Sequence, residues 1–145
     1  MENLTFEPRL YIIMREDLCD MNPGKGMAQA AHAQALFDQY ETEMQANAVH
    51  EKYQPEREFL DAVSDWRGVN DHCRGFGTTI VLSAPKSQWM DISMGFEHYG
   101  YVEDPTYPYR NHYGQVFTSS EDTCMWAFAT TEAEADYVKN IPLHP

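Results

Sequence analysis

The sequence has few basic side chains, few cysteines and no long apolar run. No apolar stretch approaches the length needed to cross a bilayer, and residues 1–9 are polar and acidic, so we expect neither a transmembrane helix nor a secretory signal. The three cysteines, Cys19, Cys73 and Cys124, are odd in number and far apart. This pattern favours reduced thiols in a cytoplasmic protein over a disulfide framework.

The shortage of basic residues bears on the class of partner. Ten Lys and Arg face 23 Asp and Glu, which gives a net charge of −13. Residues 1–40, 41–75 and 76–145 hold three, four and three basic side chains against six, eight and nine acidic ones, so none of these segments is basic. Such a protein repels a polyanion at long range. Nucleic-acid binding therefore requires that the fold gather its dispersed cations on one face.

The length and composition predict one globular domain. The chain has 145 residues, 43% of them hydrophobic and 23% charged. Apolar runs and turn residues predict strands at 10–14, 78–82, 101–102 and 123–129, and helices from Asn22-Pro23 through 37, from Pro55 to Gly68, from Pro85 to near Gly100, and from Thr131 to Asn140. The order β-α-α-β-α-β-β-α predicts an α/β domain of residues 1–145: a mostly buried mixed sheet flanked by helices in three α/β/α layers.

The secondary structure of two segments is open to more than one interpretation. Residues 41–54 are polar and either extend the first helix or depart from it. Residues 104–122, rich in Pro, Tyr and Asn, read as a long and functional or mobile loop.

Two packing contacts are expected. The first helix should cross the sheet through the small side chains of Ala28, Ala31 and Ala35. A helical insertion around 41–75 should lie at the periphery of the sheet, anchored by an apolar stripe of Phe59, Val63 and Trp66.

The start of the first helix carries a polar stripe. Lys25, Gln29 and His32 are spaced i, i+4 and i+7, which places them on one side of a helix. A lysine in the first turn opposes the helix dipole, but beside free first-turn amides it builds an anion site. A solvated surface stripe is the other interpretation. The Gly-Lys pair is not a phosphate-binding P-loop, because the preceding glycine and the following Ser or Thr are missing.

The same segment resembles the signature of type 2 peptidyl-tRNA hydrolases. That family opens with a strand, Arg-x-Asp-Leu, a Met, a Gly-Lys turn and Ala-Gln-x-x-His-Ala on its first helix. Here these features are the strand 11–14, Arg15 to Leu18, Met21, Gly24-Lys25, Ala28-Gln29 and His32-Ala33. The turn is one residue longer than in the family, and the match covers about the first quarter of the chain.

The remainder of the chain is similar to the family in fewer positions. Residues 79–82 resemble its second strand, and residues 102–104 resemble the approach to its Asp-Ala-Gly-Arg-Thr loop. Of that loop only Asp104 is retained; Pro108 stands at the position of the threonine, with Thr106 close by. The family's Gly-Ile-Gly-Pro ending of the last strand is absent from 125–130.

The resemblance implies hydrolysis of the ester that joins a peptide to tRNA, with no metal and no cofactor. Ester hydrolysis needs a positioned water, a base and positive charge near the developing oxyanion. By resemblance Lys25 supplies the charge, and Asp104 acts with Thr106 as base or water-positioner. Gly24, Gln29 and His32 line the substrate side. For Asp104, the start of an Asp-Pro turn is an equally good interpretation. Asp17 is expected to be a structural hydrogen-bond acceptor rather than a catalyst.

Several alternatives stay open. Arg110 with the tyrosines at 107, 109 and 113 either binds the unpaired end of tRNA or covers the core. His72, Cys73, His98 and His112 show no zinc spacing, so ordinary roles are expected for them. The chain is an active hydrolase, an inactive relative that binds a protein or small ligand, or an acidic mimic of nucleic acid. A protein partner, including a second copy in a homodimer, is compatible with each.

Overall fold

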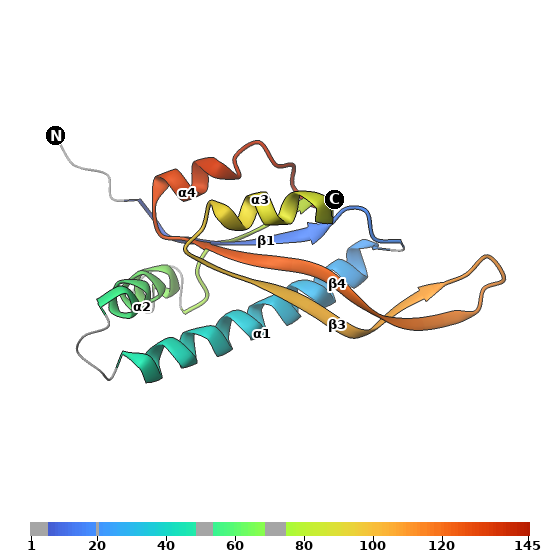
Figure 1. Ribbon diagram of the computed structural model, residues 1–145, viewed down its shortest axis with the longest axis horizontal. Coiled ribbons are helices and arrows are strands. Elements are labelled where there is room, and N and C mark those ends of the chain that lie inside the picture. The colour runs from blue at the N-terminus through green and yellow to red at the C-terminus, as the bar shows by residue number, and fades with distance from the viewer. Residues whose placement is uncertain (1–5, 20, 49–53, 69–74) are drawn as a thin grey trace.

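The computed structural model describes residues 6–19, 21–48, 54–68 and 75–145. Its elements, coloured along the chain in Figure 1, are β1 (Arg9–Arg15), α1 (Pro23–Asn47), α2 (Gln54–Arg67), β2 (Thr79–Ala84), the 3-10 helix η1 (Lys86–Gln88), α3 (Trp89–Met94), β3 (His98–Arg110), β4 (Val116–Ala129) and α4 (Glu132–Tyr137). Apart from η1, this is the predicted order. His72 and Cys73 lie outside the described residues.

The four strands form one mixed sheet in the order β2-β1-β4-β3. β1 runs parallel to β2 and antiparallel to β4, and β3 is antiparallel to β4. Ile12, for example, lies between Val81 of β2 and Trp126 of β4. The prediction that strand 10–14 is interior to a mixed sheet is confirmed.

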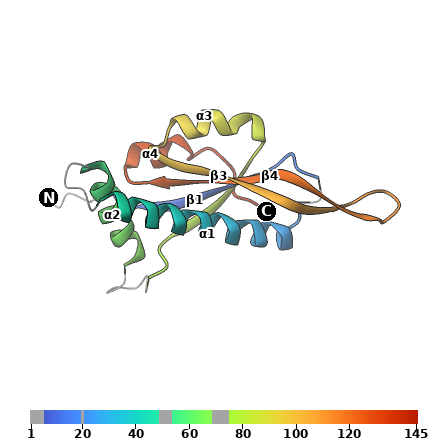
Figure 2. The same cartoon turned by 60° about the horizontal axis from the view of Figure 1, so that its bottom comes forward.

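Alternate residues of β1 contribute to two separate hydrophobic clusters. Leu10, Ile12 and Met14 pack with α1 and α2. Tyr11 and Ile13 pack with α3 and α4. Figures 1 and 2 show the two pairs of helices on different sides of the sheet. The period of two along a strand thus divides the core between the two faces of the sheet.

Helix α1 begins as predicted but packs through a different stripe. The Asn22 side chain accepts a hydrogen bond from the Lys25 amide, and Pro23 is the first helical residue. Ala28, Ala31 and Ala35 are exposed, so the prediction that they cross the sheet is wrong. The buried stripe is Gly26, Gln29, Ala33, Phe37 and Met44. It contains Phe37 and Met44, whose side chains remove more apolar area from water than those of the three exposed alanines would.

The predicted helical structure around 41–75, with its three buried anchors, is confirmed where it is described. α1 continues to Asn47, which resolves the alternative for residues 41–47, and α2 follows with Phe59, Val63 and Trp66 all buried. The rings of Phe59 and Trp66 lie edge-on to Phe37, with centroids 6.1 and 5.4 Å away. α2 therefore completes one of the two cores. Residues 49–53 and 69–74 of the predicted insertion lie outside the described residues.

The predicted loop 104–122 is wrong: it is a β-hairpin. β3 continues to Arg110 and β4 starts at Val116, with Tyr109 paired to Phe117. Asn111 accepts hydrogen bonds from the amides of Tyr113 and Gln115. Gly114 has φ 81°, a conformation that favours glycine. β3 is at the edge of the sheet, where proline is tolerated in a strand. We call residues 105–120 the arm; Figures 1 and 2 show it projecting past the remainder of the sheet.

The helix that follows β2 is also shorter than predicted. Pro85 precedes η1, and α3 ends at Met94, well before Gly100. The predicted short strand 101–102 is part of the 13-residue β3. Thr131 caps α4 as expected, because its hydroxyl accepts a hydrogen bond from the Glu134 amide. The Glu134 carboxylate in turn accepts from the amide of Thr130. Among the described residues, no helix is both long and apolar enough to cross a membrane.

Candidate functional site

Gln29 and Asp104 meet between α1 and β3. The Gln29 side chain is only 3% exposed, and its amide nitrogen donates a hydrogen bond of 2.8 Å to Oδ2 of Asp104. Its amide oxygen accepts a bond of 2.6 Å from the hydroxyl of Thr123, which is fully buried in β4. Because the oxygen is held by Thr123, the amide nitrogen faces Asp104. Three elements are thus joined by one buried polar side chain.

Asp104 is held from its other side by Thr106. The Thr106 amide donates to Asp104 Oδ1 at 2.9 Å, and the Thr106 hydroxyl lies 3.4 Å from the same oxygen. Burial raises the Asp104 pKa, but the hydrogen bonds from Gln29 and Thr106, together with nearby His32, outweigh it and leave that pKa below its ordinary value. Asp104 is therefore ionised at neutral pH. The bond two residues along the chain is the one expected of a turn-starting aspartate.

Lys25 reaches the base of the arm. Its Nζ donates a hydrogen bond of 2.7 Å to the Pro108 carbonyl and lies 5.3 Å from the centre of the Tyr107 ring. Tyr107 is buried, and its hydroxyl donates to the Cys19 carbonyl at 3.1 Å. Lys25 and Gln29, one helical turn apart, therefore contact β3 at Pro108 and Asp104.

The predicted site residues are brought together only in part. Lys25, Gln29, Asp104 and Thr106 converge where α1 meets β3. The predicted wall of Lys25, Gln29 and His32 is divided, because Gln29 is buried and His32 is exposed.

The other two predicted substrate contacts, Gly24 and Arg110, lie outside the cluster formed by Gln29, Asp104 and Thr106. Gly24 is exposed at the start of α1. Arg110 is at the far end of β3, where it donates to the Gly114 carbonyl at 3.2 Å. It is six positions along the strand from Asp104, a distance of about 20 Å. The structure therefore does not place Arg110 beside the carboxylate.

No protein-family model and no curated protein matches this chain. The case for the site therefore depends on its geometry and on the motif residues quoted above.

Thr123 is the residue of the site that sequence reasoning missed. It stands at the start of the apolar segment 123–129, where a single threonine is common in a strand. Its role arises from the contact with Gln29, which is 94 residues away in sequence. The sequence holds no local signal for a contact of this kind.

Asp17 belongs to a different polar cluster. Its Oδ1 accepts a bond from the Lys86 amide at 3.0 Å and pairs with Arg15 at 3.2 Å. Burial raises the Asp17 pKa, but these contacts lower it below its ordinary value. Lys86 also pairs with Asp122 at 2.8 Å. The prediction that Asp17 is a structural acceptor is confirmed.

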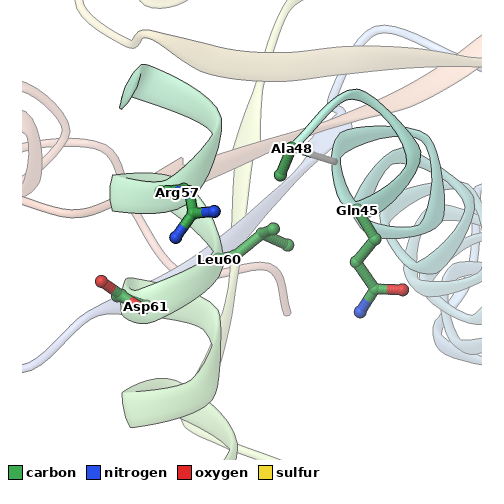
Figure 3. A pocket seen from close by; sticks show the side chains of 5 residues that line it. All are labelled: Gln45, Ala48, Arg57, Leu60 and Asp61. Atoms are coloured by element: carbon green, nitrogen blue, oxygen red, sulfur yellow. The ribbon is translucent and has the colours of Figure 1, made fainter. Parts of the chain in front are cut away.

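Two pockets lie away from Lys25 and Asp104. Figure 3 shows one of about 340 Å³ between the end of α1 and α2, lined by Gln45, Ala48, Arg57, Leu60 and Asp61. The other, about 400 Å³, is lined by residues of α2, the start of β3 and the segment before α4. Within the described ranges, no group of three or more His, Cys, Asp or Glu is placed to hold a metal ion.

Proposed function

We propose that this chain hydrolyses the ester bond of peptidyl-tRNA and releases peptide and free tRNA. One observation carries most of the proposal: the 2.8 Å hydrogen bond between Gln29 and Asp104, which are 75 residues apart. Two residues of the expected site are therefore in direct contact. One belongs to the helix motif, and the other is the retained aspartate of the family's loop. Lys25 contacts the same strand four residues further along.

Asp104 would position the attacking water. A carboxylate offers about four acceptor positions, and Gln29 and Thr106 account for three hydrogen bonds. About one position is left for water. Because the pKa of Asp104 is lowered, this carboxylate is a weak base. Its proposed role is therefore to orient the water and to favour the positive charge that develops on it during attack.

Lys25 would stabilise the oxyanion. An ammonium group has three donors, and one of them is used by the Pro108 carbonyl. The remaining two are available to the ester oxygen as negative charge develops on it. Lys25 also stands in the first turn of α1, beside backbone amides that favour anions.

The deciding experiment is release of peptide from peptidyl-tRNA by the purified protein. We expect Lys25→Ala to reduce the rate on the order of a hundredfold or more. Its stability should change little, because partly exposed lysines contribute within about 0.5 kcal/mol. Lys139→Ala, which removes an exposed lysine beyond α4, is the matched control and should retain full activity.

Asp104→Asn should slow turnover with a smaller effect on tRNA binding. Asparagine can still accept from Gln29 but lacks the charge that orients the water. A folded wild-type protein that never releases peptide, or a Lys25→Ala variant as fast as wild type, refutes the enzymatic proposal.

An inactive relative that binds a protein or a small ligand is the second candidate. The net charge of −13 favours it, because a polyanionic substrate is repelled by most of the surface. For either candidate we also propose the family's three-layer α/β/α arrangement and a cytoplasmic location. Helices packed against both hydrophobic clusters of the core support the three-layer arrangement.

A further inference from the structure

Acidic side chains are absent from two stretches that the fold brings together. Residues 21–37, the start and first half of α1, contain no Asp or Glu, and neither does the arm, residues 105–120. Each stretch has a single basic residue, Lys25 or Arg110, in a chain whose net charge is −13. The hydrogen bond from Lys25 to Pro108 joins the two stretches. The fold therefore brings together two stretches that contribute no carboxylate. They are bordered by Asp104, Glu103 and Glu121, which accept hydrogen bonds from Thr106, Ser120 and Ser119 of the arm.

Aromatic rings run along the arm from Lys25. Tyr107 and Tyr109 are two residues apart on β3 and face the same side of the ribbon. The Tyr107 ring lies 5.3 Å from Lys25 Nζ, and the Tyr109 ring lies 6.1 Å from that of Phe117 across the ribbon. Phe117 is 43% exposed. A row of rings thus leads away from the lysine of the candidate site.

The tip of the arm adds another exposed ring. Tyr113 is 78% exposed, and its ring lies 4.0 Å from that of His112. Arg110 is exposed beside it. In Figures 1 and 2 no helix of the described chain lies over this part of the arm. A two-stranded ribbon of this kind is marginally stable in water by itself, so a partner that covers its exposed rings would stabilise it.

We infer that the arm and the first half of α1 bind single-stranded RNA, with bases stacked on Tyr109, Tyr113 and Phe117. Aromatic side chains and arginine are the groups that stack on unpaired bases, and in this acidic chain a polyanion is repelled least by the stretches that contribute no carboxylate. Arg110 would contact a phosphate at the outer end of the row, and Lys25 stands at its inner end. The inference rests on the proposed function in one respect: the strand would lead its terminal ester to Lys25 and Asp104.

The test measures binding of a short fluorescein-labelled single-stranded RNA that ends in CCA. Fluorescence anisotropy at low salt gives the affinity. We expect Tyr113→Ala and Phe117→Ala each to weaken binding about fivefold or more, because stacking on one ring contributes that much per base. Tyr99→Ala removes a half-exposed ring from the other end of β3 and should leave affinity unchanged. An RNA duplex, whose base faces are covered, should compete poorly.

Charge is tested separately. Arg110→Ala should reduce the salt dependence of binding by about 0.7 in the slope of log K against log salt, the contribution of one phosphate contact on a single strand. Lys139→Ala should leave that slope unchanged. The two readouts separate stacking from phosphate contact, because Tyr113→Ala should lower affinity at every salt concentration and leave the slope as it is.

The outcomes differ for the arm and for the proposed reaction. RNA binding that the arm variants weaken supports the inference even where no ester is cleaved, in which case only the proposed function fails. RNA binding that all arm variants retain overturns it. Absence of RNA binding, with a wild-type dimer in sedimentation that Tyr113→Ala dissociates, also overturns it and assigns the arm to a second copy of this chain.

Discussion

Replacing Gln29 by leucine tests the polar connection between α1, β3 and β4. Leucine has nearly the volume of glutamine, so Gln29→Leu leaves the packing of α1 on the sheet almost intact. It removes the amide that donates to Asp104 at 2.8 Å and accepts from Thr123 at 2.6 Å. The variant therefore isolates two hydrogen bonds from the apolar contacts around them.

The expected loss follows from the two partners left behind. Thr123 is fully buried, and a buried hydroxyl without its acceptor costs about 1–3 kcal/mol. A hydrogen bond to a charged group contributes about 1.5–3 kcal/mol, but Asp104 is partly exposed, so water replaces much of that bond. Greater burial of apolar surface by leucine offsets part of the loss. We expect a net destabilisation of about 2–4 kcal/mol, which for a domain of this size lowers Tm by about 5–15 °C.

Thermal and urea denaturation measure this loss, with Gln34→Leu as the matched control. Gln34 lies on the same helix, and its side-chain amide donates to Asp38 on the exposed surface at 3.0 Å. That pair contributes about 0.2–0.5 kcal/mol. The Asp104 pKa, followed by NMR of its carboxyl carbon, should rise in Gln29→Leu and stay unchanged in Gln34→Leu. Equal stability of the two variants would refute the reasoning.

A double-mutant cycle attributes the loss to Thr123. In the wild-type background, Thr123→Val removes one partner of a buried hydrogen bond and should destabilise by about 1 kcal/mol or more. In the Gln29→Leu background, the same change removes a hydroxyl that already lacks its acceptor, so it should be neutral or stabilising. An identical effect in both backgrounds contradicts the bond between the two side chains.

Three further predictions concern the core, a thiol and acid stability. Phe37→Ala should cost about 3–5 kcal/mol in urea denaturation, because the ring is fully buried among the aromatic side chains of one core. Burial raises the pKa of Cys124 to about 12, so in the folded protein it should resist alkylation at neutral pH while exposed Cys19 reacts; labelling of both at equal rates, seen by mass spectrometry, would contradict this. The lowered pKa of Asp104 stabilises the fold fully above its unfolded value near 3.9, and this contribution disappears as pH falls through the folded value. The difference in unfolding free energy between wild type and Asp104→Asn should therefore shrink as the solution is acidified from about pH 4.

Local signals predicted the beginnings of helices and the buried strand well. Asn22-Pro23 places a cap and a proline where the first helix begins, and Thr131 caps the last helix by accepting from Glu134. The apolar run in β1 has no polar interruption, which is typical of a strand covered on both faces. In each case the information lies within a few residues of the feature.

The packing face of α1 could not be predicted in the same way. In the alanine-rich segment several stripes are equally small, so periodicity alone does not select one. The selection depends on Phe37, which packs against rings of α2 and β4, and on Gln29, whose partners are in β3 and β4. These contacts join residues far apart in sequence, and no local pattern encodes them.

The arm was missed for a related reason. Proline at positions 105 and 108 argues against a strand, unless that strand lies at the edge of a sheet, and the position of β3 in the sheet is a property of the whole fold. The prolines lower the intrinsic strand propensity of β3. The cross-strand pair of Tyr109 and Phe117 offsets this by stabilising the hairpin. The net charge of a long segment likewise gives no sign of the two stretches without Asp or Glu. These stretches, in α1 and in the arm, are separate in sequence and adjacent in space.

Gln29 and Lys25 differ in what they can reveal about function. An enzyme and an inactive relative would both need the Gln29–Asp104 hydrogen bond, because it ties β3 to α1 whatever the site does. Lys25 is different, since its hydrogen bond to the Pro108 carbonyl is partly exposed and holds little of the fold together. A lysine in the first turn of a helix opposes the dipole and so adds little stability there, and the proposed function assigns it to the developing oxyanion. Activity measurements on Lys25, rather than stability measurements on Gln29, therefore distinguish the two candidate functions.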